Sequence, residues 1–304
     1  MTGLLCKNPR IVLILGTGYL GKALAESLRK AGHTALTADI DPQKAIYEAD
    51  VADQASMQGL AARIPSPQII VMCASTRGGG EEAYRNLYAH GTRNTLEAFS
   101  GTPVIFCSST AVYGITDGRW ITEEHNVYPS SGKNGLLIQA EQAVLAAGGT
   151  VVRLGALYGP GPLCSRLPST SRRGRPSPEP MNRWLNYIHR DDAAAALHLL
   201  CTLREPPAGI YNLTDRTPMQ MGEIYSYLSN LLGKPAPQPE PLPAEARRGL
   251  LQPEDFLLPP YGPGLGTALP KLCGRCAQCA GGTGRVILPS SFSTLTGPFR
   301  TFHK

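Results

Sequence analysis

The sequence predicts an α/β protein built on a doubly wound parallel β-sheet. Short apolar runs of strand length alternate with amphipathic helical patterns over the first two-thirds of the 304 residues. The first run, "RIVLIL", leads through a glycine-rich turn directly into a helical pattern. Strands that alternate with helices form parallel sheets with helices on both faces. Apolar residues make up 42% of the chain, which is enough to fill a buried core of that kind.

The elements follow in order along the chain. Strands are predicted over 10–15, 33–40, 45–51, 68–75, 102–109, 150–157 and 209–214, where short apolar runs alternate with the helical patterns. Helices are predicted over 19–31, 54–63, 81–99, 133–147, 190–203 and 219–233, with Asp191 or Asp192 as the N-cap of the helix from 190. A proline-rich linker follows, and residues 258–304 are predicted to be an irregular or disordered tail because they lack acidic residues and periodicity.

Composition excludes several classes of protein. The net charge is +6, but the basic residues are scattered apart from a cluster at 166–175, so nucleic-acid binding is not expected. No apolar run has the length of a membrane span, and "RIVLIL" is typical of a strand rather than a signal peptide. Cysteines within apolar strands favour a reducing, cytoplasmic location over a disulfide framework. The tail motif C-x-x-C-x-x-C, from Cys273, lacks a fourth ligand nearby, so no metal is expected.

The glycine-rich turn after the first strand predicts a dinucleotide-binding site. Gly16 permits the tight turn, Gly18 lets the backbone approach a pyrophosphate, and Gly21 allows close packing of helix on strand. The helix N-terminus would supply free amides to the phosphates. The alternative is that these glycines serve only a turn. The predicted cofactor loop comprises Gly16, Thr17, Gly18, Tyr19, Leu20 and Gly21.

Polar and small residues at three further strand ends extend this site, which is typical of a Rossmann-type sheet. Asp39, at the end of the second strand, would accept hydrogen bonds from the ribose hydroxyls and repel a 2′-phosphate, which favours NAD over NADP. The alternative for Asp39 is a solvated loop aspartate, and for the others an ordinary strand end. Near the adenine we expect Asp50 and Val51, and beneath the cofactor Cys73, Ala74 and Ser75.

The sequence resembles the extended short-chain dehydrogenase/reductases of the NAD-dependent epimerase/dehydratase family. The motifs "GTGYLG", "EADV", "VMCAS", "YAHGTRNTLEA", "FCSSTAVYG", "VVRLGALYGPG" and "NYIHRDDAAAA" stand in the family's order. The resemblance implies an NAD(P)-binding domain over 1–165, with 186–215 packing back on it. It also implies a small C-terminal substrate lobe from 166–185 and 216–257.

The resemblance assigns Ser109 to the position whose hydroxyl polarises the reacting oxygen of the substrate. The alternative is a serine that only bonds the backbone at the strand end. The family's Tyr-x-x-x-Lys pair falls on Lys133 and Leu137, so the pair is missing and the chain resembles an atypical branch. In the family, a nearby ammonium lowers the pKa of the phenol so that it can act as a base. Lys133 is a candidate substitute; the alternative is a solvated lysine in the first turn of a helix.

These features predict an NAD(P)-binding oxidoreductase or epimerase/dehydratase-like enzyme that acts on a hydroxyl/carbonyl pair. A small molecule is the expected partner, and a nucleotide sugar is one candidate. Arginines near 166–175 could clamp its diphosphate; the alternative, which is favoured, is a mobile, solvated basic loop. The alternatives are a non-catalytic NAD(P) sensor that has lost the Tyr/Lys pair, and a decayed gene product. A homodimer is left open.

Overall fold

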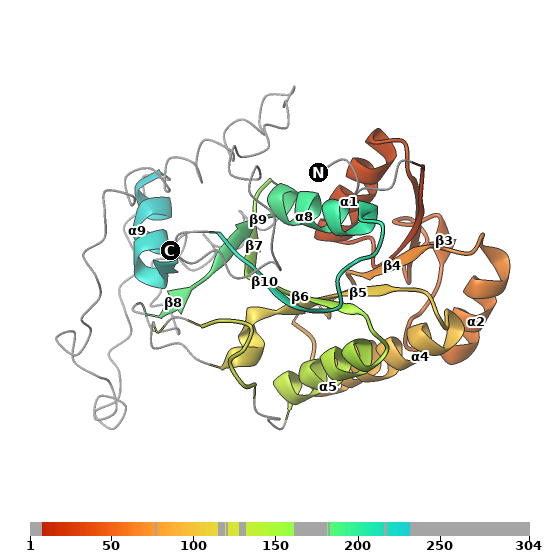
Figure 1. The fold of residues 1–304 in the computed structure, drawn as a ribbon. Helices are drawn as coiled ribbons and strands as arrows, with labels where there is room; N and C mark the ends of the chain where they lie inside the picture. Colours follow the sequence, from red (N-terminus) through yellow and green to blue (C-terminus); the bar gives the residue numbers. More distant parts are fainter. Residues whose placement is uncertain are drawn as a thin grey trace.

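A computed structural model describes residues 8–76, 78–114, 119, 121–127, 132–160, 181, 183–215 and 218–231. Seven parallel strands form the central sheet in the order β10-β6-β5-β4-β1-β2-β3. Helices cover both faces, with α1 and α8 on one and α2, α4 and α5 on the other (Figure 1). The predicted doubly wound parallel sheet is thereby confirmed.

The sheet strands are β1 (Ile11–Leu15), β2 (Thr34–Asp39), β3 (Tyr47–Glu48), β4 (Ile69–Met72), β5 (Val104–Ser109), β6 (Thr150–Leu154) and β10 (Gly209–Leu213). Two small sheets pair β7 (Ala156–Tyr158) with β9 (Tyr187–His189) and β8 (Trp184–Leu185) with β11 (Met219–Gln220). The helices are α1 (Tyr19–Lys30), α2 (Gln54–Arg63), α3 (Glu81–Tyr84), η1 (Arg85–His90), α4 (Gly91–Ala98), η2 (Thr110–Tyr113), α5 (Lys133–Ala146), α8 (Arg190–Thr202) and α9 (Met221–Leu231). Among the described residues, no helix is long and apolar enough to cross a membrane.

The central strands are buried on both faces, which explains their continuous apolar runs. On β5, Phe106 packs with residues of α2 and α5, whereas Ile105 packs with residues of α1 and α8. β1 lies between β2 and β4, and the chain changes its winding direction at that point. The carboxyl ends of β1 and β4 therefore flank the place where open α/β sheets bind ligands.

Four sequence predictions differ from the structure in detail. The strand expected over 45–51 shortens to β3, and the one over 150–157 divides into β6 and β7 at Gly155, because β7 leaves the central sheet to pair with β9. A side chain at Gly155 would lie 2.8 Å from the Asn186 carbonyl oxygen. The helix over 81–99 contains a π-helical segment, η1. The fourth difference is the N-cap residue of α8.

The N-cap of α8 is His189, so the prediction of Asp191 or Asp192 was wrong. The imidazole Nδ1 of His189 accepts a hydrogen bond from the Asp191 amide at 3.3 Å. Because β9 runs directly into the helix, the last strand residue takes the capping position and both aspartates fall in the first turn. In the first turn, the negative charges of both aspartates still interact favourably with the positive end of the helix dipole.

We predict that stability falls as the pH drops below about 6.5, the usual pKa of histidine. The rings of His33 and His198 lie 5.8 Å apart, and burial lowers the pKa of both, with Arg10 adding to the effect on His33 and His33 to that on His198. Below pH 6.5 the unfolded chain therefore binds protons that the folded protein does not, which favours unfolding. Urea unfolding at pH 7.5 and 5.5 would measure this. A His198→Asn variant should show a smaller loss, and an equal loss would contradict the assignment.

Candidate functional site

Close packing requires glycine at Gly16, in the loop between β1 and α1, and at Gly21, in the first turn of α1. Gly16 has a φ of +92°, a conformation that favours glycine, and a side chain there would lie 2.4 Å from the backbone of Ala74. A side chain at Gly21 would lie 2.1 Å from the Gly16 carbonyl oxygen. The loop is therefore wedged between the first turn of α1 and the residues that follow β4.

The same loop is open where a phosphate would approach. A side chain at Gly18 would meet no atom within 4 Å. Gly18 is the N-cap of α1 and supplies no side-chain hydrogen bond to the first helical amides. Thr17 is 8% exposed, and its hydroxyl has no hydrogen-bond partner within the described part of the chain. A buried hydroxyl beside free helix amides fits an anionic group such as a pyrophosphate.

Asp39 is held at the rim of this loop by backbone amides. Its carboxylate accepts a hydrogen bond from the Thr17 amide at 2.8 Å and another from the Asp41 amide at 3.1 Å. The carboxylate is half-buried and lies next to the loop. The contact with the Asp41 amide also fits the alternative of a loop aspartate, so the ribose role of Asp39 stays a prediction.

Asp50 and Val51 lie after β3, next to the end of β2. The Ala49 amide donates to the Asp39 carbonyl at 3.1 Å, which ties the two segments together. The Asp50 carboxylate accepts a hydrogen bond from the Ala52 amide at 2.9 Å and so stabilises the turn in which it lies. Val51 packs against Gly91 of α4, where a side chain would approach it to 2.9 Å.

The residues that follow β4 form the other wall of the loop. The Cys73 amide donates to the Leu15 carbonyl at 2.8 Å, and Ala74 contacts Gly16 as described above. Ser75 is exposed. The structure thus brings the glycine loop, Asp39 and the 73–75 segment to one edge of the sheet.

Ser109 ends β5 at the same carboxyl edge. Its hydroxyl oxygen accepts a hydrogen bond from the Ala111 amide at 3.2 Å and caps η2. The backbone role considered for this serine is therefore present. It uses only the acceptor side of the hydroxyl, and the O–H remains able to donate to another oxygen.

Lys133 and Leu137 lie one turn apart at the start of α5, in different surroundings. Lys133 is exposed, and its Nζ lies 5.4 Å from the centroid of the Tyr84 ring. Leu137 is 5% exposed and packs in the core together with Ala140 and Val144. Helix α5 therefore places a cation at the first of the two positions and an apolar side chain at the second.

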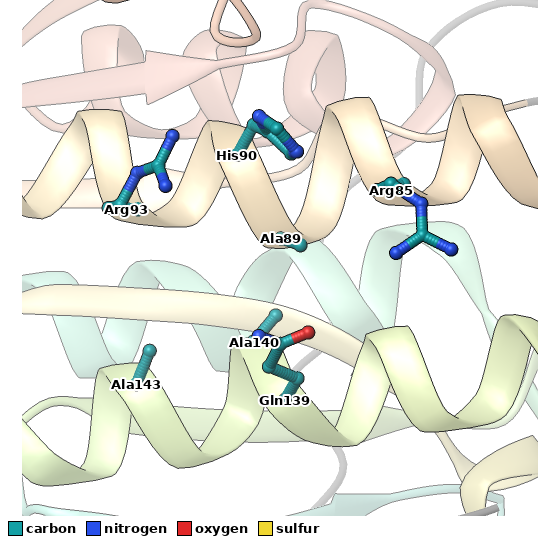
Figure 2. Close-up of a pocket in the computed structure, with 7 residues that line it drawn as sticks. All are labelled: Arg85, Ala89, His90, Arg93, Gln139, Ala140 and Ala143. Carbon is teal, nitrogen blue, oxygen red and sulfur yellow. The ribbon is translucent and has the colours of Figure 1, made fainter. Parts of the chain in front are cut away.

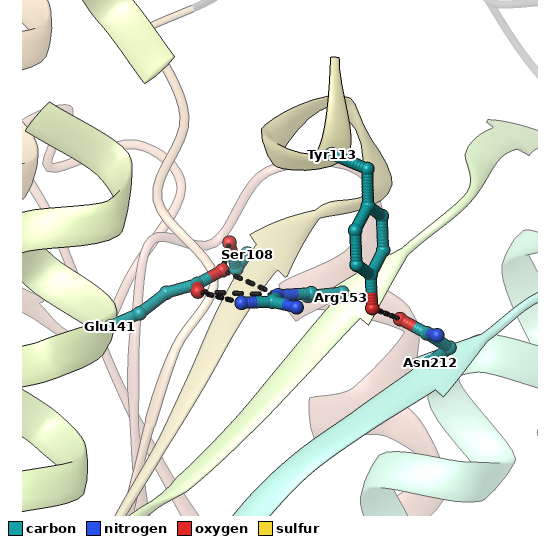
Figure 3. Close-up of polar contacts among 5 residues, drawn as sticks. All are labelled: Ser108, Tyr113, Glu141, Arg153 and Asn212. Carbon is teal, nitrogen blue, oxygen red and sulfur yellow. Dashed lines mark hydrogen bonds and ion pairs between the residues drawn. The ribbon is translucent and has the colours of Figure 1, made fainter. Parts of the chain in front are cut away.

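Sequence reasoning missed a buried ion pair that contacts Ser108, the residue before Ser109. Arg153 of β6 and Glu141 of α5 are each 1% exposed and are joined by two parallel hydrogen bonds, Nη2 to Oε2 at 2.6 Å and Nε to Oε1 at 3.1 Å (Figure 3). The Ser108 hydroxyl donates to the same carboxylate. A single charged residue in the apolar stretch "TVVRL" was the available signal.

The network extends from the ion pair to the last strand of the sheet. The Arg153 guanidinium lies 4.7 Å from the centroid of the Tyr113 ring, and the Tyr113 hydroxyl donates to the Asn212 side chain at 2.7 Å (Figure 3). Burial raises the pKa of Tyr113, so the phenol stays protonated as a donor. The backbone amide of Asn212 donates a hydrogen bond to the Glu123 carboxylate at 2.8 Å. These contacts connect the turn after Ser109 to β6 and β10.

A groove of about 310 Å³ lies elsewhere, between α5 and the segment formed by η1 and α4 (Figure 2). Two arginines, a histidine and Ala89 line one side, and Gln139 with two alanines of α5 lines the other. No residue predicted for the cofactor or for catalysis lines it. We therefore assign the candidate site to the sheet edge, where the polar groups converge.

Several predictions concern residues outside the described part of the chain. They are the basic cluster at 166–175, the tail over 258–304 with its C-x-x-C-x-x-C motif, and most of the expected substrate lobe. Of that lobe, 181, 183–185 and 218–231 are described and contain β8, β11 and α9. The segment 186–215 packs on the central sheet through β10 and α8.

Comparison with known proteins adds independent evidence. The profile of the "NAD dependent epimerase/dehydratase family" matches residues 12–214. A Methylobacillus flagellatus protein assigned as an NAD-dependent epimerase/dehydratase is 25% identical, with a TM-score of 0.65 over 90% of this chain and 99% of that one. No curated protein sequence matches.

Two further solved structures share the fold. MoeE5 in complex with UDP-glucuronic acid and NAD is 23% identical, with a TM-score of 0.65 over 74% of this chain and 83% of that one. The UDP-glucose 4-epimerase of Thermus thermophilus in complex with NAD is 20% identical, with a TM-score of 0.64 over 77% of this chain and 86% of that one.

Proposed function

This chain belongs to the NAD dependent epimerase/dehydratase family, and from that membership we propose that it is an NAD-binding oxidoreductase of the epimerase/dehydratase type. It acts on a hydroxyl/carbonyl pair of a small molecule. The observation that carries the proposal is the glycine loop: Gly18 is open to an incoming group, and the Thr17 hydroxyl is buried without a partner in the described residues. A pyrophosphate would satisfy that hydroxyl and the free amides of α1.

NAD is the proposed cofactor in preference to NADP. The Asp39 carboxylate is fixed beside the loop by the Thr17 and Asp41 amides, and its oxygens could still accept bonds from ribose hydroxyls. A 2′-phosphate at the same place would meet this negative charge. Asp50, Val51 and the 73–75 segment would border the adenine and the remaining length of the cofactor.

The chain's own residues would orient and polarise the substrate. Bound NAD supplies the hydride acceptor. The Ser109 O–H, free to donate, would hydrogen-bond the reacting oxygen of the substrate and stabilise charge that develops on it. For proton transfer we propose Lys133, because it stands at the start of α5 beside the turn that Ser109 caps: the Asn134 side chain donates to the Ala111 carbonyl at 3.2 Å.

A nucleotide sugar is the proposed substrate class. MoeE5, which shares the fold, has been solved with UDP-glucuronic acid and with UDP-glucose, each together with NAD. The family membership and this likeness support the same class here. The specific sugar and base are left to experiment.

Turnover of bound or added NAD with a panel of nucleotide sugars tests the proposal. We expect absorbance changes of the reduced nicotinamide with at least one substrate. A Ser109→Ala variant should lower kcat by about 10²–10³-fold, the usual effect of removing one such donor, and leave NAD affinity unchanged. Native mass spectrometry of the purified chain would report retained cofactor and subunit count. No turnover across the panel, with NAD bound, would contradict the enzymatic role.

A second function, a non-catalytic NAD-binding sensor, is favoured by one observation. Leu137 is buried in the core at the position where the family's lysine would lie, so α5 supplies no ammonium there. A sensor would bind NAD through the same loop but show no turnover, and Ser109→Ala would leave its biological effect intact.

A further inference from the structure

Two cysteines face each other across neighbouring strands at the carboxyl edge of the sheet. The parallel register of β4 and β5 pairs Met72 with Phe106, so the next residues along both strands, Cys73 and Cys107, are also opposite each other. Their sulfur atoms are 3.6 Å apart. Neighbouring strands lie about 4.8 Å apart, a separation of backbones that a disulfide can span.

The two cysteines adjoin the two halves of the proposed site. Cys73 directly precedes Ala74, which is packed against the Gly16 turn of the cofactor loop. Cys107 lies two residues before Ser109 on the same strand. A bond between these cysteines would therefore join the cofactor wall to the strand that carries the catalytic candidate.

We propose that Cys73 and Cys107 form an oxidation site, in which a hydroperoxide converts the two thiols to a disulfide that weakens cofactor binding. The second clause rests on the proposed function, whereas the formation of the disulfide does not.

The chemistry needs only the two thiols and the peroxide. The Cys73 sulfur attacks the O–O bond, which breaks to leave a sulfenic acid on Cys73 and release one alcohol or water molecule. The Cys107 sulfur then attacks the Cys73 sulfur and forms the S–S bond, and the sulfenic oxygen leaves as water together with the thiol proton. Over both steps, two electrons pass from the thiols to the peroxide. The hydrogen bond with Cys73, together with burial, raises the pKa of Cys107. Because the thiolate is the reactive form, we place Cys107 in the second step.

Closing the bond changes the packing of the cofactor wall. A disulfide has an S–S length of about 2.05 Å, so the sulfurs must approach by about 1.5 Å from their present separation of 3.6 Å. Ala74 has no spare room against Gly16, where a single added carbon would lie 2.4 Å from the Ala74 backbone. Because close-packed interiors transmit displacements, a shift of the Cys73 backbone is expected to reach the glycine turn through Ala74.

Disulfide formation is tested by peptide mapping of the full chain after reduction, removal of reductant and exposure to hydrogen peroxide. We expect a Cys73–Cys107 cross-linked peptide that disappears on treatment with dithiothreitol. A Cys201→Ala variant should form it equally, because Cys201 is a buried free thiol outside the pair. Cys107→Ala, or Cys107→Ser if the first does not fold, should not. Peroxide-treated protein whose other cysteines are oxidised, but which lacks this peptide, would overturn the proposal.

The effect on the cofactor is tested by calorimetric titration with NAD. We expect oxidised wild-type protein to bind NAD at least about tenfold more weakly than reduced protein, with affinity restored by dithiothreitol. In Cys107→Ala, peroxide can oxidise Cys73 but cannot close the disulfide, so the loss of affinity should be smaller than in the wild type. A cross-linked protein with unchanged affinity would overturn the coupling. Failure of reduced protein to bind NAD would instead contradict the proposed function and the coupling together, while the mapping result would stand.

Discussion

Replacing Gly18 with valine is expected to abolish NAD binding while leaving the protein folded. A side chain at this position meets no protein atom within 4 Å, and its φ of −79° is accessible to other residues. The added carbons would instead occupy the space through which a pyrophosphate reaches the amides of α1. We expect affinity for NAD to fall at least about 100-fold, or about 2.8 kcal/mol, with an unchanged thermal unfolding midpoint.

Two other glycines provide the controls. Gly59, on α2, also has nothing within 4 Å of an added side chain, so Gly59→Val should leave NAD affinity unchanged. Gly21→Ala should instead destabilise the fold, because its new carbon would lie 2.1 Å from the Gly16 carbonyl oxygen. If Gly18→Val kept NAD affinity within threefold of the wild type, the loop would not be the phosphate site.

Breaking the buried Glu141–Arg153 pair is expected to cost about 3–5 kcal/mol of unfolding free energy. Both side chains are 1% exposed, so Glu141→Leu would leave the Arg153 guanidinium buried without its counter-charge. It would also remove the acceptor of the Ser108 hydroxyl. Urea unfolding of the variant and of the wild type measures the difference.

The double variant Glu141→Leu with Arg153→Met distinguishes a broken pair from a damaged core. Because no charge is then left buried, most of the lost stability should return. The exposed pair between Arg85 and Glu81 offers a matched comparison, since its side chains are 53% and 54% exposed. Glu81→Gln should change the free energy of unfolding by less than about 1 kcal/mol. Equal losses at the two sites would contradict the role of burial.

Sequence patterns predicted the elements well where the determining interactions are local. The helix over 19–31 is observed as α1 because its apolar residues recur at helical spacing, and the strand over 10–15 is observed as β1. The break at Gly155 and the His189 cap were missed. Both depend on the pairing of β7 with β9, which cannot be predicted from the sequence of either segment alone.

The sequence by itself determined the doubly wound fold, the family and the glycine-rich turn that we propose as the cofactor loop. Those features depend on the periodicity of apolar residues and on glycines a few positions apart, so residues that are near one another in the sequence suffice to specify them. Only the tertiary structure decided that Glu141 meets Arg153, that Cys73 faces Cys107, and that Leu137 is buried beside the site. These contacts depend on the lateral order of strands and the seating of α5. That order is set by packing of the whole core, which acts between residues far apart in the chain.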